Sequence, residues 1–422
     1  MKSETILPQT VSILVNTDVV PYGERWFEGE PEMRKNILFI TLMAVVVLSG
    51  CSEKNTTVNP SDNAETSESS ASASISDSER SDLSDDIMCI SENSDYYRNG
   101  IVFGNDKAMF LDFDTMESAP LCAVPNCKHT GSDCIAKTVG NTPIFYGDSI
   151  YYFLSNHGAV KETSDGPEFY IDSKLMKASL DSSTTETVCE FHDCAPPEQL
   201  GKYVLYQNNL YFVGDDLNPV KDDFGGLNYG NSGGNHFLCS INLDTGAYTN
   251  YGSIYDGDKK YEAAAYSSQA VISGVYQDKM YLGYTFIEDM NSLDSGNFEF
   301  TYLNFEFDFQ TKTWKESELP YSRYMNRNTY TYFDQSEKQF HVLYNGKEEM
   351  IPYEYEITNC SEFNGKLFIP NDEKWFDLTD LSEHSFAEYK NYQVVGYVND
   401  NYILLNGSRS KKITEEELCS LQ

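Results

Sequence analysis

The sequence predicts an all-β fold, most simply a β-propeller of six or seven four-stranded blades, with seven preferred. Two observations lead to this prediction. Tyrosine and phenylalanine are abundant, at 31 and 24 of 422 residues, and aromatic side chains favour strands because they pack well on a pleated, half-buried surface. Short phrases that combine a strand, a tight turn and a second strand also recur along the chain. Two β-sandwich domains remain the alternative, since alternation and turn spacing suit both folds.

The first recurring phrase is an aromatic or apolar residue, two or three polar turn residues, and a strand rich in Tyr or Phe. Its turn pairs are Asn-Asn, Gln-Asp, Asn-Gly and Asn-Asp, which tolerate the positive φ that tight hairpins require. The phrase predicts a β-hairpin at each of five places: 146–153, 206–213, 276–283, 363–369 and 398–405.

A second phrase follows at a variable distance and consists of an apolar alternating strand, an Asp or polar turn, and another strand. It occurs at 174–181, 237–246 and 302–312. Two hairpins per unit, repeated at roughly 30 to 70 residues, are typical of four-stranded propeller blades. Units are expected to begin near Tyr97, Tyr146, Tyr206, Tyr276, Tyr330, Phe363 and Tyr397.

The last unit is short, so we expect a strand around Ile87 to Ile90 to complete it. Cys89 and Cys419 would then lie where the ring closes, and a disulfide between them would lock the closure. Thr414 and Glu417 form a capping-box pattern that predicts a short terminal helix. The propeller is therefore expected to span residues 87–422.

Residues 33–51 have the order of a membrane-targeting signal. Met33 is followed by Arg34 and Lys35, then by an apolar run over 37–48, and then by Ser49 and Gly50 before Cys51. The run is shorter than the roughly 20 apolar residues that span a bilayer, so a cleaved signal is expected rather than a permanent helix.

The segments on either side of this signal are expected to have no fold of their own. Residues 1–32 precede a complete signal, so we expect Met33 to be the native start and 1–32 to lie outside the native protein. Residues 52–86 contain eleven Ser and no aromatic residue. Such a segment cannot bury enough apolar surface to offset its ordering entropy, so we predict a disordered acidic linker.

The lipobox-like end at Cys51, the tandem hairpin phrases and the segment 120–129 (PLCAVPNCKH) together resemble a known group. The chain is similar to propeller lipoproteins common in gut Firmicutes, and distantly to propellers of the TolB and low-density-lipoprotein-receptor-related groups. The resemblance implies cleavage between Gly50 and Cys51 and attachment of diacylglycerol to the Cys51 thiol. The protein is then expected on the extracytoplasmic face of the cell membrane.

The charge of the chain limits its partners. With 66 acidic and 30 basic residues, its formal net charge is −36, which repels phosphate backbones and argues against nucleic acid as a partner. We expect the propeller to bind an unknown protein or glycan at the cell surface without chemistry of its own. An extracytoplasmic glycan-active enzyme and a metal-binding sensor are the alternatives.

No catalytic residue is assigned. Residues 230–234 fit the pattern G-x-S-x-G, but a strand-like segment follows where a nucleophile elbow needs a helix. We therefore interpret this stretch as a loop between strands.

Two cysteine–histidine clusters stand out. The first is Cys122, Cys127, His129 and Cys134, three thiols and an imidazole within thirteen residues. A disulfide within this set is the favoured interpretation for an exported chain, and a tetrahedral Zn²⁺ site is the alternative. No cofactor other than this zinc is expected.

The second cluster is thinner and comprises Cys189, His192 and Cys194. Its spacing favours a small disulfide loop at a blade end, and a metal site shared with the first cluster is a lesser alternative. Cys239 and Cys360 lie in strand-like contexts and are expected to be buried thiols.

Overall fold

A computed structural model describes most of the chain beyond residue 87. The described residues are 88–90, 100–104, 107–131, 134–139, 143–163, 166–196, 202–215, 220–221, 227–228, 236–255, 269–287, 300–322, 324–326, 328–334, 336–351, 353, 357 and 360–420. All of the described residues belong to the unit Asp82–Gln422. The signal at 33–51, the lipidation site Cys51 and the linker at 52–86 lie outside the described residues and stay predictions.

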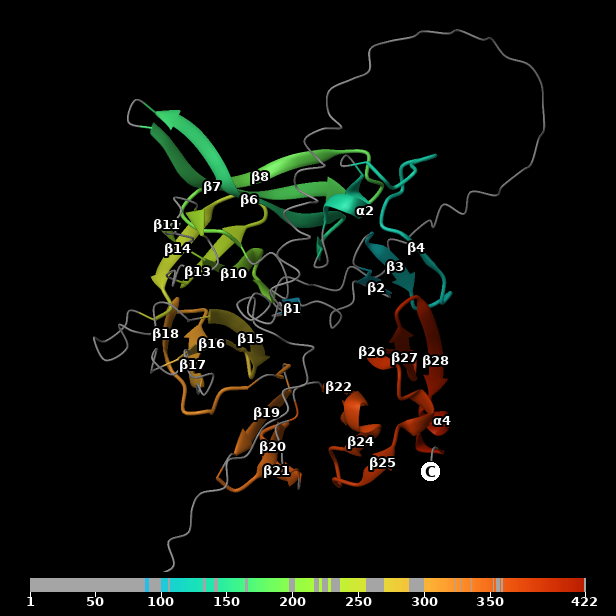
Figure 1. Cartoon of the computed structure of the whole chain (residues 1–422). Helices are drawn as coiled ribbons and strands as arrows, with labels where there is room; N and C mark the ends of the chain where they lie inside the picture. Colours follow the sequence, from blue (N-terminus) through green and yellow to red (C-terminus); the bar gives the residue numbers. More distant parts are fainter. Residues whose placement is uncertain are drawn as a thin grey trace, which may run out of the picture. The chain divides into compact units, whose positions relative to one another are not determined.

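Seven antiparallel sheets account for nearly all of the described secondary structure (Figure 1). Blade one contains β2 (Gly100–Phe103), β3 (Met109–Asp112) and β4 (Ser118–Pro120). Blade two contains β5 (Ile144–Tyr146), β6 (Ser149–Thr163), β7 (Gly166–Ser179) and β8 (Thr185–Phe191). Blade three contains β1 (Met88–Ile90), β9 (Tyr203–Tyr206), β10 (Asn209–Asp215), β13 (His236–Asn242) and β14 (Tyr248–Ser253).

The remaining blades follow in chain order. Blade four contains β15 (Gln269–Tyr276), β16 (Lys279–Ile287), β17 (Phe300–Asp308) and β18 (Thr313–Glu316). Blade five contains β19 (Thr329–Asp334), β20 (Gln339–Tyr344) and β21 (Lys347–Ile351). Blade six contains β22 (Ser361–Phe363), β23 (Lys366–Ile369), β24 (Lys374–Asp377) and β25 (Glu383–Ser385). Blade seven contains β26 (Gln393–Val398), β27 (Asn401–Asn406) and β28 (Arg409–Thr414).

A few short elements lie outside the blades. Strands β11 (Val220–Lys221) and β12 (Leu227–Asn228) form a separate two-stranded hairpin between β10 and β13. The described helical segments are α2 (Ile135–Thr138), η3 (Pro370–Asp372), η4 (Ala387–Tyr389) and α4 (Glu415–Cys419). No described helix is both long enough and apolar enough to span a bilayer.

Seven apolar clusters join these blades into a closed ring. Six of them each lie between two consecutive blades. The seventh brings Ile101 and Leu111 of blade one against Val395 and Ile403 of blade seven. Because every sheet buries both of its faces against neighbours, the alternation seen in the sequence becomes the packing between blades. The fold is therefore a seven-bladed β-propeller, as predicted.

The predicted tight hairpins are present with the expected backbone. Both residues of the pairs Gln277–Asp278 and Asn399–Asp400 have φ between 47° and 60°, the conformation of a type I′ turn that matches strand twist. Asn364 and Gly365 also adopt positive φ. In the hairpin that joins β9 and β10 the turn pair is Gln207–Asn208 rather than Asn-Asn, because Tyr206 pairs with Asn209.

These hairpins give the two ends of the ring different connections. In blades two, three, four and six, tight turns join the first strand to the second and the third strand to the fourth. Because neighbouring strands are antiparallel, both turns lie at the same end of the blade. At the opposite end, the connections 216–235, 256–268 and 288–299 leave the described strands of blades three and four. We call these the turn end and the loop end.

The structure corrects the prediction for the ends of the propeller. The strand Met88–Ile90 does not complete blade seven; it pairs with β9 of blade three, with Cys89 opposite Val204. Cys419 lies at the end of α4, after blade seven, so the predicted Cys89–Cys419 closure is wrong. The α4 helix itself is as predicted, because Thr414 and Glu417 form a complete capping box.

Blades one, five and seven show three described strands each rather than four. In blade five, Met325 forms an isolated bridge with Tyr330 of β19 and takes the place of a short first strand. In blade seven, α4 follows the third strand, and its Leu418 is fully buried in the cluster between blades six and seven.

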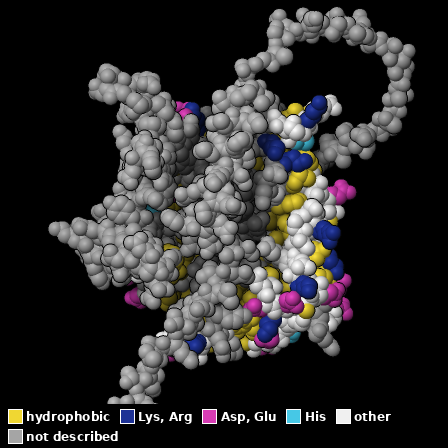
Figure 2. Space-filling model, viewed as in Figure 1, with side chains coloured by type: hydrophobic (Ala, Val, Ile, Leu, Met, Phe, Trp, Pro, Cys, Tyr) yellow, Lys and Arg dark blue, Asp and Glu magenta, His cyan; other side chains and the backbone are white. Residues whose placement is uncertain are grey.

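The surface of blades six and seven carries charges of both signs. Figure 2 shows acidic and basic side chains close together on the side of the molecule where these blades lie. In blade six, Lys374 contacts Glu383 at 2.7 Å, and the buried ammonium group of Lys366 contacts Glu415 at 2.8 Å. Despite the acidic composition of the chain, this edge is therefore not a patch of one sign.

Candidate functional site

The structure brings together all four residues of the first predicted cluster. The Sγ atoms of Cys122, Cys127 and Cys134 and a ring nitrogen of His129 lie within 4.8 Å of one another. The Cys134 Sγ lies 3.5 Å from His129 Nδ1. Cys134 is buried and the other three are partly buried. We call this set the Cys₃His cluster.

The backbone around the Cys₃His cluster is folded tightly to make this convergence possible. Asn126 and His129 both adopt left-handed φ, at 59° and 53°, a conformation that Asn and His tolerate better than most residues and that reverses the chain here. The N–H of Cys127 donates to the Val124 carbonyl at 3.2 Å. The N–H of His129 donates to the Cys127 Sγ at 3.3 Å, so the chain reversal also provides a hydrogen bond to one of the sulfur atoms.

The cluster lies in the connection between blades one and two. Leu121 N–H donates to the Ala108 carbonyl at 2.9 Å, and Ala108 N–H donates to the Ala136 carbonyl of α2 at 2.8 Å. Ala123 N–H reaches the Ser182 hydroxyl of blade two at 3.4 Å. Burial raises the pKa of the Cys134 thiol to about 11, and hydrogen bonds with Cys127 and Cys122 add to this effect.

No disulfide joins any two of the nine cysteines that the structure describes. The favoured interpretation of the first cluster, a disulfide, is therefore not seen in the structure. The thiols of Cys122, Cys127 and Cys134 instead share one small volume with an imidazole.

The second predicted cluster is not gathered in this way. Cys189 is buried between blades two and three, with its thiol directed to the Glu190 carbonyl at 3.8 Å. His192 is largely exposed and lies 3.8 Å from Asp172. Cys194 lies beside a different residue, Cys239 of β13, at 3.7 Å between sulfur atoms.

Cys194 and Cys239 share a hydrogen-bonding partner. The Tyr248 hydroxyl lies 3.4 Å from Cys194 Sγ and 3.2 Å from Cys239 Sγ, and it donates to Asp193 at 2.9 Å. The contact with Cys239, together with burial, raises the pKa of Cys194 far above its usual value. Both thiols are fully buried, which confirms the predicted core role of Cys239 and indicates packing rather than reactivity. Cys360, predicted as a second core thiol, is partly buried against the cluster between blades five and six.

A trio that the sequence did not single out lies at the β19–β20 turn. Candidate ligand atoms of Asp334, Glu337 and His341 lie within 4.8 Å of one another. The Glu348 Oε1 atom lies 2.9 Å from His341 Nδ1, and the Tyr332 ring stacks on the imidazole with 4.5 Å between ring centroids. The buried His341 Nε2 finds no hydrogen-bond partner among the described residues. The sequence signal that could have identified this trio is the spacing Asp-x₂-Glu-x₃-His across a tight turn.

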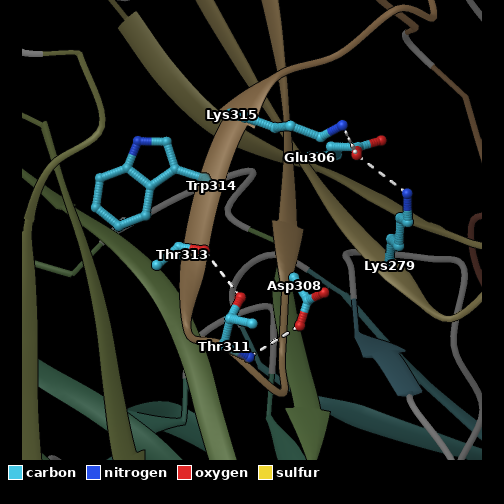
Figure 3. Close-up of a pocket in the computed structure, with 7 residues that line it drawn as sticks. All are labelled: Lys279, Glu306, Asp308, Thr311, Thr313, Trp314 and Lys315. Carbon is cyan, nitrogen blue, oxygen red and sulfur yellow. Dashed lines mark hydrogen bonds and ion pairs between the residues drawn. The ribbon is translucent and has the colours of Figure 1, made fainter.

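A hollow of about 180 Å³ lies on blade four near the turn end (Figure 3). On one side, Glu306 accepts from Lys279 and Lys315, both at 3.0 Å. Burial opposes ionisation, but these two ammonium groups keep the pKa of Glu306 below its ordinary value. On the other side, Asp308 accepts the N–H of Gln310 at 2.8 Å, which makes an Asx turn, and the N–H of Thr311 at 2.9 Å. The charges of this hollow are thus engaged within the protein.

An exposed aromatic group lies at the loop end of blade four. Tyr302 of β17 is 41% exposed, and its ring lies 5.0 Å from that of Tyr321 and 6.3 Å from that of Phe300. A Cβ on Gly283 of β16 would collide with the Tyr321 ring, so the glycine allows this ring to lie on the sheet. We call Phe300, Tyr302 and Tyr321 the aromatic shelf.

Comparisons with known proteins return only remote likeness. No family model matches the chain, and no curated protein matches it. Among solved structures, YjhT is 13% identical and covers 76% of this chain and 93% of its own, with a TM-score of 0.32.

Two further structures are similarly remote. An oligogalacturonate lyase in complex with manganese is 10% identical over 77% of this chain and 89% of its own, with a TM-score of 0.28. TolB from Acinetobacter baumannii is 12% identical over 75% of this chain and 79% of its own, with a TM-score of 0.20. The assignment of a propeller therefore depends on the seven sheets themselves and not on these matches.

Proposed function

We propose that this protein is a lipid-anchored, extracytoplasmic β-propeller that binds a ligand at the cell surface through its loop end. The aromatic shelf is the observation that carries the proposal. A propeller supplies a rigid ring, and long connections at one end of a rigid scaffold are the usual location of binding residues. Here the shelf lies on a strand end from which one of these connections leaves.

The chemistry of the shelf favours a glycan as the ligand. A large exposed aromatic surface beside polar groups stacks well against the apolar face of a sugar ring, and Tyr adds a hydroxyl that forms hydrogen bonds. Most other large aromatic side chains of the described blades are buried between sheets. Tyr302 is the exception among the described tyrosines, since it alone belongs to the exposed large apolar residues.

A glycan-binding screen tests this proposal. The unit Asp82–Gln422 is screened against cell-wall and dietary glycans, and a hit is compared between the wild type and Tyr302→Ala. Losing one stacked ring is expected to weaken binding about tenfold, equivalent to ~1.4 kcal/mol. Met350→Ala, which removes a 54% exposed side chain from blade five, is the matched control. Equal affinity of wild type and Tyr302→Ala for the same glycan would contradict the role of the shelf.

The membrane anchor is supported by the sequence alone and needs its own test. Metabolic labelling with an alkyne fatty acid is expected to label the wild type, and Cys51→Ser is expected to lose the label and leave the membrane fraction. A Cys419→Ser variant controls for labelling of another exposed thiol. Unchanged labelling of Cys51→Ser would exclude this residue as the lipidation site.

A further inference from the structure

We propose that Cys122, Cys127, His129 and Cys134 bind one structural Zn²⁺ ion that fastens the connection between blades one and two. The proposal is independent of ligand binding at the loop end, so either can fail without the other.

The distances within the Cys₃His cluster suit a tetrahedral metal site. Bonds of about 2.3 Å to sulfur and about 2.0 Å to nitrogen place neighbouring ligand atoms roughly 3.5–3.8 Å apart around a tetrahedral zinc. Cys134 Sγ and His129 Nδ1 are separated by 3.5 Å, and all four ligand atoms fall within 4.8 Å. An ion can therefore be accommodated with small side-chain adjustments.

The backbone hydrogen bond to Cys127 is a second and independent observation. A backbone N–H directed at the Cys127 sulfur helps to hold this side chain where its Sγ lies close to the other three candidate ligand atoms. His129, whose N–H donates this bond, adopts φ of 53° in the turn. The imidazole of His129 in the same turn lies 3.5 Å from Cys134 Sγ, so one turn positions two of the candidate ligands.

The surroundings of the cluster explain why a metal would be useful at this place. Residues 121–143 connect two blades, and their only described regular element is the four-residue helix α2. A segment with so little secondary structure gains stability from a metal, because metal binding free energy becomes folding free energy. Leu121 and Cys122 pack beside α2 in the cluster between blades one and two, so fixing Cys122 also fixes this interface.

The ligand set indicates a structural role rather than a catalytic one. Four protein ligands fill a tetrahedral coordination sphere and leave no position for water or substrate. Three thiolates and a neutral imidazole also select zinc over the hard cations magnesium and calcium, which prefer oxygen ligands.

Metal analysis of the full chain tests the proposal. The protein is purified in detergent under reducing conditions and analysed by inductively coupled plasma mass spectrometry. One zinc per chain is expected, with loss of zinc in Cys127→Ser and Cys134→Ser. Two controls should keep the metal: Cys419→Ser, which alters an exposed thiol outside the cluster, and His341→Asn, which alters the trio at the β19–β20 turn.

Further measurements separate loss of a ligand from loss of the fold. His129→Cys is expected to retain zinc, whereas His129→Ala weakens competition against a chromogenic chelator at least tenfold. Cobalt exchanged into the wild type should give the intense visible bands of tetrahedral coordination together with thiolate charge-transfer absorption. A folded wild type that contains no zinc would overturn the proposal, whether these thiols are free or, in protein purified without reductant, joined in a disulfide. Zinc retained in Cys127→Ser or lost only in His341→Asn would overturn it as well.

Discussion

Ring closure in this propeller depends on side-chain packing, and replacing Phe113 by Ala tests that dependence. The side chain follows β3, is fully buried, and belongs to the cluster between blades one and seven. Its ring lies against Gly396 of β26, where a Cβ would come within 2.8 Å of the phenyl carbon Cε2. Among the described strands, none from one terminus pairs into the sheet at the other terminus, so this cluster carries the closure.

The magnitude of the effect follows from burial. Truncating a fully buried Phe to Ala removes the transfer free energy of the ring and leaves a cavity, which together cost about 3–5 kcal/mol. A domain is stable by only ~5–15 kcal/mol, so Phe113→Ala should lower the urea midpoint strongly. Hydrogen exchange should rise first in β2, β3, β26 and β27, the strands on either side of the cavity.

Phe110→Ala is the matched control, because residue 110 lies on β3, just before Phe113 in the chain, but faces the other way. Its ring packs towards blade two, 6.4 Å from that of Phe145. This variant should loosen blades one and two while leaving exchange in β26 and β27 unchanged. A loss below about 1 kcal/mol in Phe113→Ala, well under the range for buried aromatic truncations, or the same exchange pattern in both variants, would refute closure by this cluster.

Two further predictions concern a turn and an ion pair. Gly365→Ala is expected to cost ~1–2 kcal/mol in urea unfolding, because φ is +72° and a Cβ would lie 3.0 Å from the Tyr344 hydroxyl. Gly407→Ala, with φ of +56° and open space, should cost less, and equal losses would exclude the steric contribution. Glu306→Gln should destabilise the protein at neutral pH. The folded pKa of Glu306 lies below its ordinary value of 4.5, so its stabilisation is present above that value and is lost as pH falls through the folded pKa. Unfolding curves of wild type and Glu306→Gln should therefore converge at acidic pH, and a constant difference down to acidic pH would contradict this reasoning.

The fold could be predicted in large part because its determinants are local. Gln277–Asp278 and Asn399–Asp400 are turn residues that tolerate positive φ, and the strands beside them alternate as a buried blade requires. The capping box that begins α4 at Thr414 is also a local signal. Each of these features depends on a few consecutive residues, so the sequence reports it directly.

The features that could not be predicted depend on contacts between distant segments. The strand 88–90 has three residues, and its short pattern suits the edge of any sheet; the structure pairs it with β9 and not with blade seven. Cys194 meets Cys239, 45 residues away, rather than the nearby Cys189. The aromatic shelf depends on Gly283, which neighbours Tyr321 only in the folded blade.

Blade one combines the two devices that hold this ring together. Its described strands are short, with four, four and three residues, so it contributes few ladder hydrogen bonds and little buried area of its own. On one face it depends on Phe113 and its neighbours for packing against blade seven. On the other face, the proposed zinc ion would fix the chain that leaves it towards blade two. Local opening of the ring is expected to begin at its least stable blade. A metal site beside that blade therefore stabilises the closed ring more than one within a larger sheet, whose strand pairing already keeps it closed.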